Sequence, residues 1–157
     1  MNTAAIATLL VRYLLVVLFL PFSALDKILG FEGAVSQAQE VFRPRILATI
    51  VLMCGLCIEI VMSIGVVTGY ADRLAALILA AYCGLTAILY KRFWAQNDFW
   101  AAQASKGRTL FWDFLKNLSL GAGFLLIVVG TNGAGLAPFL ADPLASSHPY
   151  AASQENP

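Results

Sequence analysis

Four long apolar segments limit this chain to one class of fold, because each approaches or exceeds the length needed to cross a lipid bilayer. A membrane-spanning helix needs about 20 mostly apolar residues. The chain has 157 residues, of which 60% are hydrophobic and only 12% charged, and its mean hydropathy is +0.79. We therefore predict an all-α membrane protein whose four transmembrane helices form a bundle. The segments cover residues 4–25, 46–68, 74–90 and 110–129.

The last segment places polar residues at one end of this bundle. Its purely apolar part is too short to span, so the helix has to begin near Leu110 and to include Asp113, Lys116 and Asn117. Spacings of three and four residues put these three side chains on one face. Lys27 reaches a similar depth if the first and fourth helices meet. These four polar residues form either a solvated cluster at the helix ends or an inner polar pocket for a headgroup, a small anion or a quinone.

The connections indicate how the helices are arranged. Pro21 is expected to kink the first helix, and the loop 26–45 has room for a short surface helix that Pro44 separates from the second span. The link between the second and third spans is so short that these helices must be antiparallel neighbours. In the fourth span the small residues 121–123 allow another helix to approach closely.

The loop 91–109 and the residues after it are rich in aromatic rings, which favour the membrane interface. We expect this loop to form a short amphipathic helix on the membrane surface, between the third and fourth spans. The predicted interfacial aromatic residues are Phe93, Trp94, Phe99, Trp100, Phe111 and Trp112.

Lys and Arg are distributed unequally between the two ends of the bundle. The first and third loops contain seven of them, whereas the opposite end has Arg73 alone. The positive-inside rule places those loops in the cytoplasm and both termini outside, in a bacterial inner membrane. The first segment lacks a preceding basic region and is expected to be retained, not cleaved as a signal peptide. Residues 1–130 form the membrane domain, and the Gly- and Pro-rich tail 131–157 is expected to be extended and to contact an extracytoplasmic partner.

Several functional classes are disfavoured by composition. The net charge of +1 and the lack of a basic stripe argue against a nucleic-acid partner. His148 is the single histidine, so the chain lacks the histidine pair that often holds haem, and we expect neither a metal nor a covalently bound cofactor. Cys54 and Cys57 are spaced as a CxxC motif, but in mid-helix, where no cation or helix N-terminus stabilises a thiolate. The geometry favours a packing role for these two residues and for Cys83, as small apolar side chains. Thiol redox chemistry is the alternative.

Two charged residues lie deep within predicted spans. Counting the rise per residue puts Arg12 and Glu59 at similar depths on adjacent helices, which predicts an intramembrane ion pair. Arg73, at the outer end of the third helix, is a competing partner for Glu59. The pair either fixes the helix register or handles protons near a quinone headgroup.

Three stretches of the chain resemble the DoxX family. They are LLVVLFLPFSALDKILGF, IEIVMSIGVVTGYADRLAALIL and FLKNLSLGAGFLLI, and together with Arg12 they extend the resemblance over residues 9–130. The matching positions are Arg12, Phe19, Ser23 and Lys27; Glu59, Gly65, Gly69, Arg73 and Ala76; and Phe114, Lys116, Asn117, Gly121 and Gly123. Lys91 and Arg92 stand where many members carry a histidine before the aromatic pair, and the tail also departs from the family pattern.

The resemblance implies a small four-helix membrane protein associated with redox systems, among them thiosulfate:quinone oxidoreductase. The first functional hypothesis is an accessory or anchoring subunit of a quinone-linked membrane complex, in contact with lipid and with other membrane subunits. The alternatives are a stand-alone quinone-interacting oxidoreductase, a structural subunit of a non-redox complex, and a transporter that dimerises. The resemblance assigns no catalytic residue.

Overall fold

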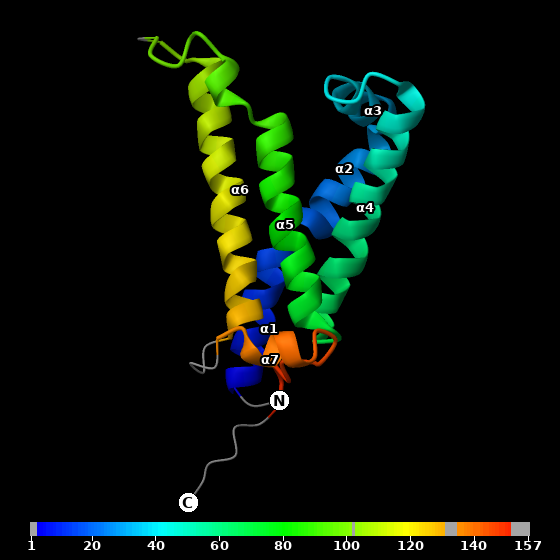
Figure 1. The fold of residues 1–157 in the computed structure, drawn as a ribbon, viewed down its shortest axis with the longest axis vertical. Helices are drawn as coiled ribbons and strands as arrows, with labels where there is room; N and C mark the ends of the chain where they lie inside the picture. Colours follow the sequence, from blue (N-terminus) through cyan, green and yellow to red (C-terminus); the bar gives the residue numbers. More distant parts are fainter. Residues whose placement is uncertain (1–2, 102, 131–134, 152–157) are drawn as a thin grey trace, which may run out of the picture.

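The computed structural model describes residues 3–101, 103–130 and 135–151, and the regular structure in these ranges is helical (Figure 1). Four helical stretches are long and apolar enough to cross a membrane, which confirms the predicted fold class. The elements in chain order are α1 (Thr3–Val16), η1 (Leu18–Ser23), α2 (Ala24–Leu29), α3 (Phe31–Gln39), α4 (Arg45–Thr68), α5 (Asp72–Tyr90), η2 (Phe93–Ala95), α6 (Lys106–Val129) and α7 (Ala137–Ala141). The first of the four spans runs from α1 through α2, the second is α4, the third is α5 with η2, and the fourth is α6.

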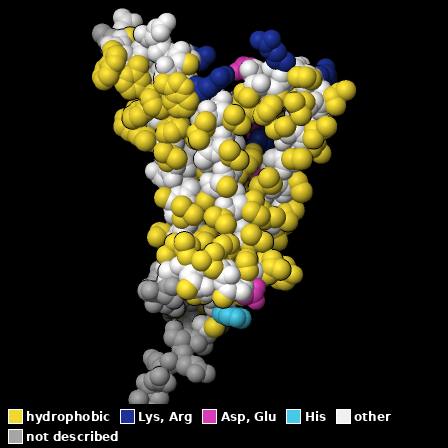
Figure 2. All heavy atoms as spheres, viewed as in Figure 1, with side chains coloured by type: hydrophobic (Ala, Val, Ile, Leu, Met, Phe, Trp, Pro, Cys, Tyr) yellow, Lys and Arg dark blue, Asp and Glu magenta, His cyan; other side chains and the backbone are white. Residues whose placement is uncertain are grey.

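The helices form two arms that meet at one end of the molecule. α5 and α6 run side by side as one arm, and α2, α3 and α4 make up the other, while α1 and α7 lie at the end where the arms join (Figure 1). Apolar side chains cover much of the visible flank of both arms, as expected for surfaces that face lipid (Figure 2). The core is at the joined end and consists of Val16, Phe19, Val66, Ala75, Ala76, Leu79, Cys83, Phe124 and Val128.

The first span, Thr3–Leu29, is broken in its second half, at the proline predicted to kink it. Leu20 has extended backbone angles (φ −125°, ψ 112°), and Pro21 lies inside the wide helical segment η1. Proline removes a backbone donor and its ring blocks the regular helix, so the chain changes direction here. As a result α2 leaves the axis of α1 and lies beside α4.

The loop after the first span contains the predicted surface helix, α3. It packs on the beginning of α4 through Val35 and Ala38 on one side and Ala48 and Leu52 on the other. Pro44 caps the start of α4, so the expected separation from the second span is also confirmed.

Small residues set the close contacts between α5 and its two neighbours. Gly69 ends α4 in the left-handed region (φ 81°), and the short turn returns α5 antiparallel to α4, as predicted. A Cβ atom at Gly65 would lie 3.0 Å from the Ala75 Cβ. A Cβ at Gly121 would lie 3.4 Å from the Ala80 oxygen, which confirms the predicted close approach at residues 121–123.

The connection between α5 and α6 differs in detail from the prediction. The expected interfacial helix is a single turn of 3-10 helix, η2, and α6 begins at Lys106, four residues before the predicted start. The Asp98 carboxylate accepts hydrogen bonds from the backbone N–H groups of Lys106 (2.7 Å) and Gly107 (3.0 Å), and Ser105 Oγ accepts one from Arg108 (3.0 Å). These acceptors satisfy the first turn of α6 and explain its earlier start.

The part of the tail that the structure describes is folded, which corrects the expectation of an extended segment. Residues 137–141 form α7, and the residues that follow return to the joined end of the bundle. The Ser147 N–H donates to Asp72 Oδ1 (2.9 Å), and the Tyr150 hydroxyl donates to the Val67 carbonyl. Residues 131–134 and 152–157 lie outside the described ranges. The tail folds back because buried acceptors on α4 and α5 give its polar groups partners.

Candidate functional site

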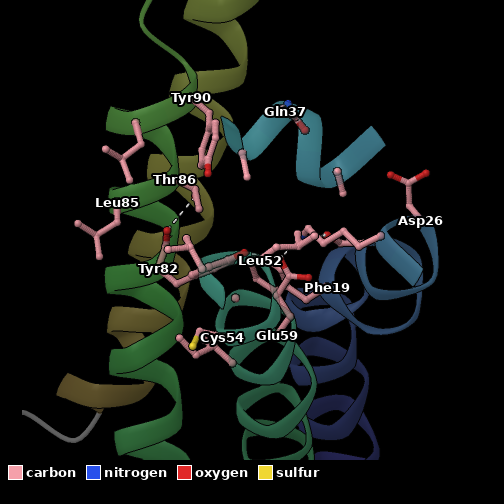
Figure 3. Close-up of a pocket in the computed structure, with 18 of the residues that line it drawn as sticks. Phe19, Asp26, Gln37, Leu52, Cys54, Glu59, Tyr82, Leu85, Thr86 and Tyr90 are labelled. Carbon is pink, nitrogen blue, oxygen red and sulfur yellow. Dashed lines mark hydrogen bonds and ion pairs between the residues drawn. The ribbon is translucent and has the colours of Figure 1, made fainter. Parts of the chain in front are cut away.

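A cavity of about 730 Å³ lies between the two arms (Figure 3). Its walls come from η1, α2 and α3 on one side and from α4 and α5 on the other, with Asn117 contributed by α6. Figure 2 shows the hollow between the arms, with Lys and Arg side chains at the rim of the end opposite α7. Most of the wall is apolar, and its larger apolar side chains are Leu18, Phe19, Ile50, Val51, Leu52, Ile58, Leu85 and Leu89.

A polar cluster closes the narrow end of this cavity. The Lys27 ammonium group pairs with Glu59 Oε1 and also donates to Ser23 Oγ at 2.8 Å. The Tyr82 hydroxyl donates to the same Glu59 oxygen at 2.7 Å. The Glu59 side chain is only 2% exposed, so these partners stabilise a carboxylate that would be very costly to bury alone.

The local sequence explains how these side chains meet. The break at Pro21 allows α2 to carry Lys27 and Ser23 toward α4. Gly55, one turn before Glu59, leaves the space that the Tyr82 hydroxyl occupies, since a Cβ there would lie 3.0 Å from that oxygen. The cluster therefore depends on a helix break in one span and a missing side chain in another.

Two polar atoms near this cluster lack a partner within the described part of the chain. They are Glu59 Oε2 and Ser63 Oγ, both buried on α4 and one helical turn apart. Unsatisfied buried acceptors are rare in proteins because each costs free energy. Lys27 has three N–H donors and uses two of them for Ser23 and Glu59. The narrow end of the cavity thus retains one Lys27 N–H donor for a further polar group, with the two buried oxygens behind it.

Arg12 and Glu59 are both buried, at 7% and 1% exposure, but the predicted ion pair between them is wrong. Arg12 pairs instead with Asp72, whose Oδ2 lies 2.7 Å from Nη1, and it donates to the Val66 carbonyl at 2.8 Å. The prediction compared the depths of the backbones only. The Arg12 side chain extends toward Asp72 and Val66 at the joined end of the bundle, while the kinked first span brings Lys27 to Glu59.

Arg73, the proposed competing partner, does not contact Glu59 either. Its Nε atom is buried and has no hydrogen-bond partner among the described residues. Arg12 and Arg73 both line a second cavity, of about 630 Å³, at the joined end of the bundle. The charges at the joined end therefore form a group separate from the cluster around Glu59.

The predicted inner polar pocket is only partly formed. Asp113 lies 3.4 Å from both Lys91 and Lys116, in partly exposed pairs at the end of α6. Lys27 does not join them, because it pairs with Glu59. Lys27 and Asn117 do line the same cavity, whereas Asp113 and Lys116 belong to the solvated helix end. Whether Lys27 and Asn117 bind a headgroup, a small anion or a quinone stays a prediction.

The predicted aromatic residues form a continuous group of ring contacts beyond α5. Phe93 is at its centre, within 5.1 to 6.1 Å of four other rings, measured between centroids. Trp100 is 91% exposed and Trp112 is 59% exposed, as suits rings at a membrane surface. The prediction omitted Phe114, which contacts Phe93 and Trp94. The contacting rings are Phe93, Trp94, Phe99, Trp100, Phe111, Trp112 and Phe114.

The three cysteines are free. Cys83 is buried in the core, as the packing interpretation requires. Cys54 and Cys57 are instead exposed on α4, and Cys54 lines the cavity between the two arms, called the inner cavity below. Within the ranges described, no group of three or more His, Cys, Asp or Glu side chains is placed to hold a metal ion. The prediction that no metal is bound stays a prediction.

Sequence reasoning missed Asp72, Tyr82 and Ser147. Asp72 seemed part of a surface turn, yet it is fully buried and accepts from Arg12 and Ser147. The feature that could have identified Asp72 is its position at the first residue of α5, at the end of the bundle toward which the Arg12 side chain extends. Tyr82 had a weaker signal, a hydroxyl in the middle of an apolar span, where such groups usually require a partner.

Comparison with protein families supports the resemblance noted in the sequence. The family model described as DoxX matches residues 7–92, which is more than half of the chain. The match ends before α6, so the likeness of the stretch FLKNLSLGAGFLLI to the family stays a prediction. Neither the curated proteins nor the solved structures give a significant match. With four spans of the expected kind and this match, the chain is a multi-pass membrane protein that belongs to the DoxX family.

Proposed function

We propose that this protein is the quinone-holding accessory subunit of a membrane redox complex. The observation that carries this proposal is the polar cluster of Lys27, Glu59 and Tyr82 at the narrow end of an otherwise largely apolar cavity within the spans. A membrane quinone combines a polar ring with a long apolar chain. The cavity offers the matching combination of surfaces.

The size and chemistry of the cavity fit such a ligand. Small-molecule sites are typically about 300–1,000 Å³, and the inner cavity has about 730 Å³. The remaining N–H donor of Lys27 suits a carbonyl oxygen of the ring, and the Glu59 carboxylate behind it carries the charge that balances this lysine. The apolar walls suit the chain.

The residues of the cluster would hold the ring and the protons that accompany electron transfer. When bound, a quinone would supply a carrier for two electrons and two protons. Glu59 and Lys27 are the groups placed to accept and return a proton at the ring oxygens, and the Tyr82 hydroxyl orients the carboxylate. The two electrons come from a partner subunit that bears its own redox centre.

The orientation of the chain completes the proposal. The rim of the inner cavity lies at the end rich in Lys and Arg, which by the positive-inside rule faces the cytoplasm of a bacterial cell. Both termini and the docked tail then face the outside, where the tail surface is open to an extracytoplasmic partner. The cavity would receive its ligand from the inner leaflet.

Gentle purification from native membranes tests this function. Mass spectrometry should find quinone in the purified complex, together with a cofactor-bearing protein in fixed ratio. Glu59→Gln should lower the quinone content severalfold. The control variant Glu32→Gln, which alters an exposed pair with Arg45, should leave it unchanged.

The same experiment separates the alternatives. Recovery of the chain alone with bound quinone would favour the stand-alone oxidoreductase. Recovery with membrane subunits that carry neither quinone nor a redox centre would contradict the proposal and favour a structural role.

A further inference from the structure

The second cavity, at the end opposite the inner cavity's rim, has a different character. It is about 630 Å³ in volume and lies between α1, the start of α5 and the end of α6, with Ser147 and Pro149 of the tail beside it. The charged residues among those described along its wall are Arg12 and Arg73, and both are positive. The remainder of the wall is mainly apolar.

Among the described residues that line this cavity or pair with its lining, positive charges outnumber negative ones. Asp72 compensates Arg12, with 2.7 Å between Oδ2 and Nη1, and the same carboxylate also accepts from Ser147. Within the part of the chain that the structure describes, Arg73 has no ion pair and its buried Nε lacks a hydrogen-bond partner. Counting described residues alone, the guanidinium groups of Arg12 and Arg73 thus have one carboxylate, that of Asp72, between them. An unpaired cation at a partly buried position is costly, so an anion that entered this cavity would be bound favourably.

The position and walls of the cavity indicate the kind of anion. Arg73 is the second residue of α5, and Gly130 directly follows α6, so the charged part of the cavity lies where the spans end and lipid headgroups begin. From there Val11 of α1 and Leu126 of α6 line the wall, and these side chains are 58% and 67% exposed on the lipid-facing surface. The cavity therefore passes from a positive mouth to an apolar groove open to the bilayer.

We propose that this cavity binds an anionic phospholipid, with the phosphate on Arg73 and an acyl chain along the groove between α1 and α6. A guanidinium group recognises phosphate through short, charge-assisted hydrogen bonds. Basic pockets between membrane helices are suited to acidic lipid headgroups. The bound lipid would join the ends of α1, α5 and α6 and neutralise the charge that the fold leaves uncompensated.

Native mass spectrometry of the detergent-solubilised full chain, titrated with phosphatidylglycerol, tests the proposal. The wild-type protein should retain one lipid, and Arg73→Gln should weaken its binding by about tenfold or more, as loss of a hydrogen bond to a charged group predicts. Arg73→Lys should keep part of the affinity. Arg92→Gln removes an exposed cation at the opposite end and should behave as wild type.

A second variant tests the groove without changing any charge. Ala7→Phe places a ring in the wall of the cavity and should weaken phosphatidylglycerol binding even though Arg73 is intact. Equal affinity of wild type and Arg73→Gln would overturn the proposal, and so would equal affinity for phosphatidylglycerol and zwitterionic phosphatidylethanolamine. Inorganic phosphate should not stabilise the protein against heat as the lipid does. If it does so equally, the site takes a free anion and the lipid assignment is wrong.

Discussion

Replacing Lys27 by Met should expose how strongly the cluster in the inner cavity depends on its cation. The substitution removes the charge that pairs with Glu59 and the donor to Ser23, and it leaves a side chain of similar length. Among the described residues, the Tyr82 hydroxyl then remains as the hydrogen-bond partner of a carboxylate that is 2% exposed. Glu59 must either stay charged without a counterion or take up a proton.

The structure sets the size of the effect. Breaking a buried ion pair from one side costs about 3–5 kcal/mol. Lys27 is 22% exposed, so water reaches part of the pair and the expected loss lies at or just below the lower end of this range, at about 2–3 kcal/mol. The double variant Lys27→Met with Glu59→Gln removes both charges. It should therefore be more stable than the sum of the single losses, with a coupling of roughly 1–3 kcal/mol.

Reversible unfolding in mixed micelles measures these free-energy losses and their coupling. It is followed for the wild type, both single variants and the double variant. The matched control is Lys91→Met, which disrupts a pair with Asp113 that is 3.4 Å long and about one third exposed. Its cost should stay below about 1 kcal/mol. Additive losses for Lys27 and Glu59 would refute the reasoning, because independent side chains cannot be the ion pair described.

Three further predictions concern the tail, the cysteines and the helix contacts. Burial raises the pKa of Tyr150 above its usual 10.0, so the docked tail favours the neutral phenol. Docking should therefore be constant below about pH 10 and weaken above it, and Tyr150→Phe should remove that pH dependence. Spin-label distances between the tail and the turn that joins α4 to α5 would measure this. Cys54 and Cys57 should remain reduced under mild oxidation, and an internal disulfide found by mass spectrometry would contradict this. Gly121→Leu should cost about 1–3 kcal/mol through crowding against Ala80, whereas Gly121→Ala should be tolerated, a contrast that thermal unfolding can check.

The parts of the fold that could be predicted from the sequence rest on local rules. The spans follow from apolar length, the bend in the first span from Pro21, and the antiparallel pair α4 and α5 from a turn too short for any other arrangement. The close contact at Gly121 follows from the absence of a side chain. Each of these depends on neighbouring residues or on one general property of the bilayer.

The site was harder to predict, because its pairings join distant elements through long side chains. Arg12 and Glu59 lie at comparable depths along their helices, yet their charged ends reach in opposite directions to Asp72 and Lys27. A long side chain extends over more than one helical turn, so backbone depth cannot select its partner. The docking of Ser147 on Asp72 had no periodic signal at all, since it depends on a carboxylate 75 residues earlier.

The most direct test of the central claim is to locate a bound quinone within the protein. A photoreactive quinone analogue, activated in membranes that contain the full chain, should label peptides of α3 and α5 that line the inner cavity, such as those with Gln37 and Thr86. Excess native quinone should suppress this labelling, and Glu59→Gln should reduce it severalfold. Labelling spread over the lipid-facing surfaces of all four spans, unaffected by competitor or by the variant, would contradict the account.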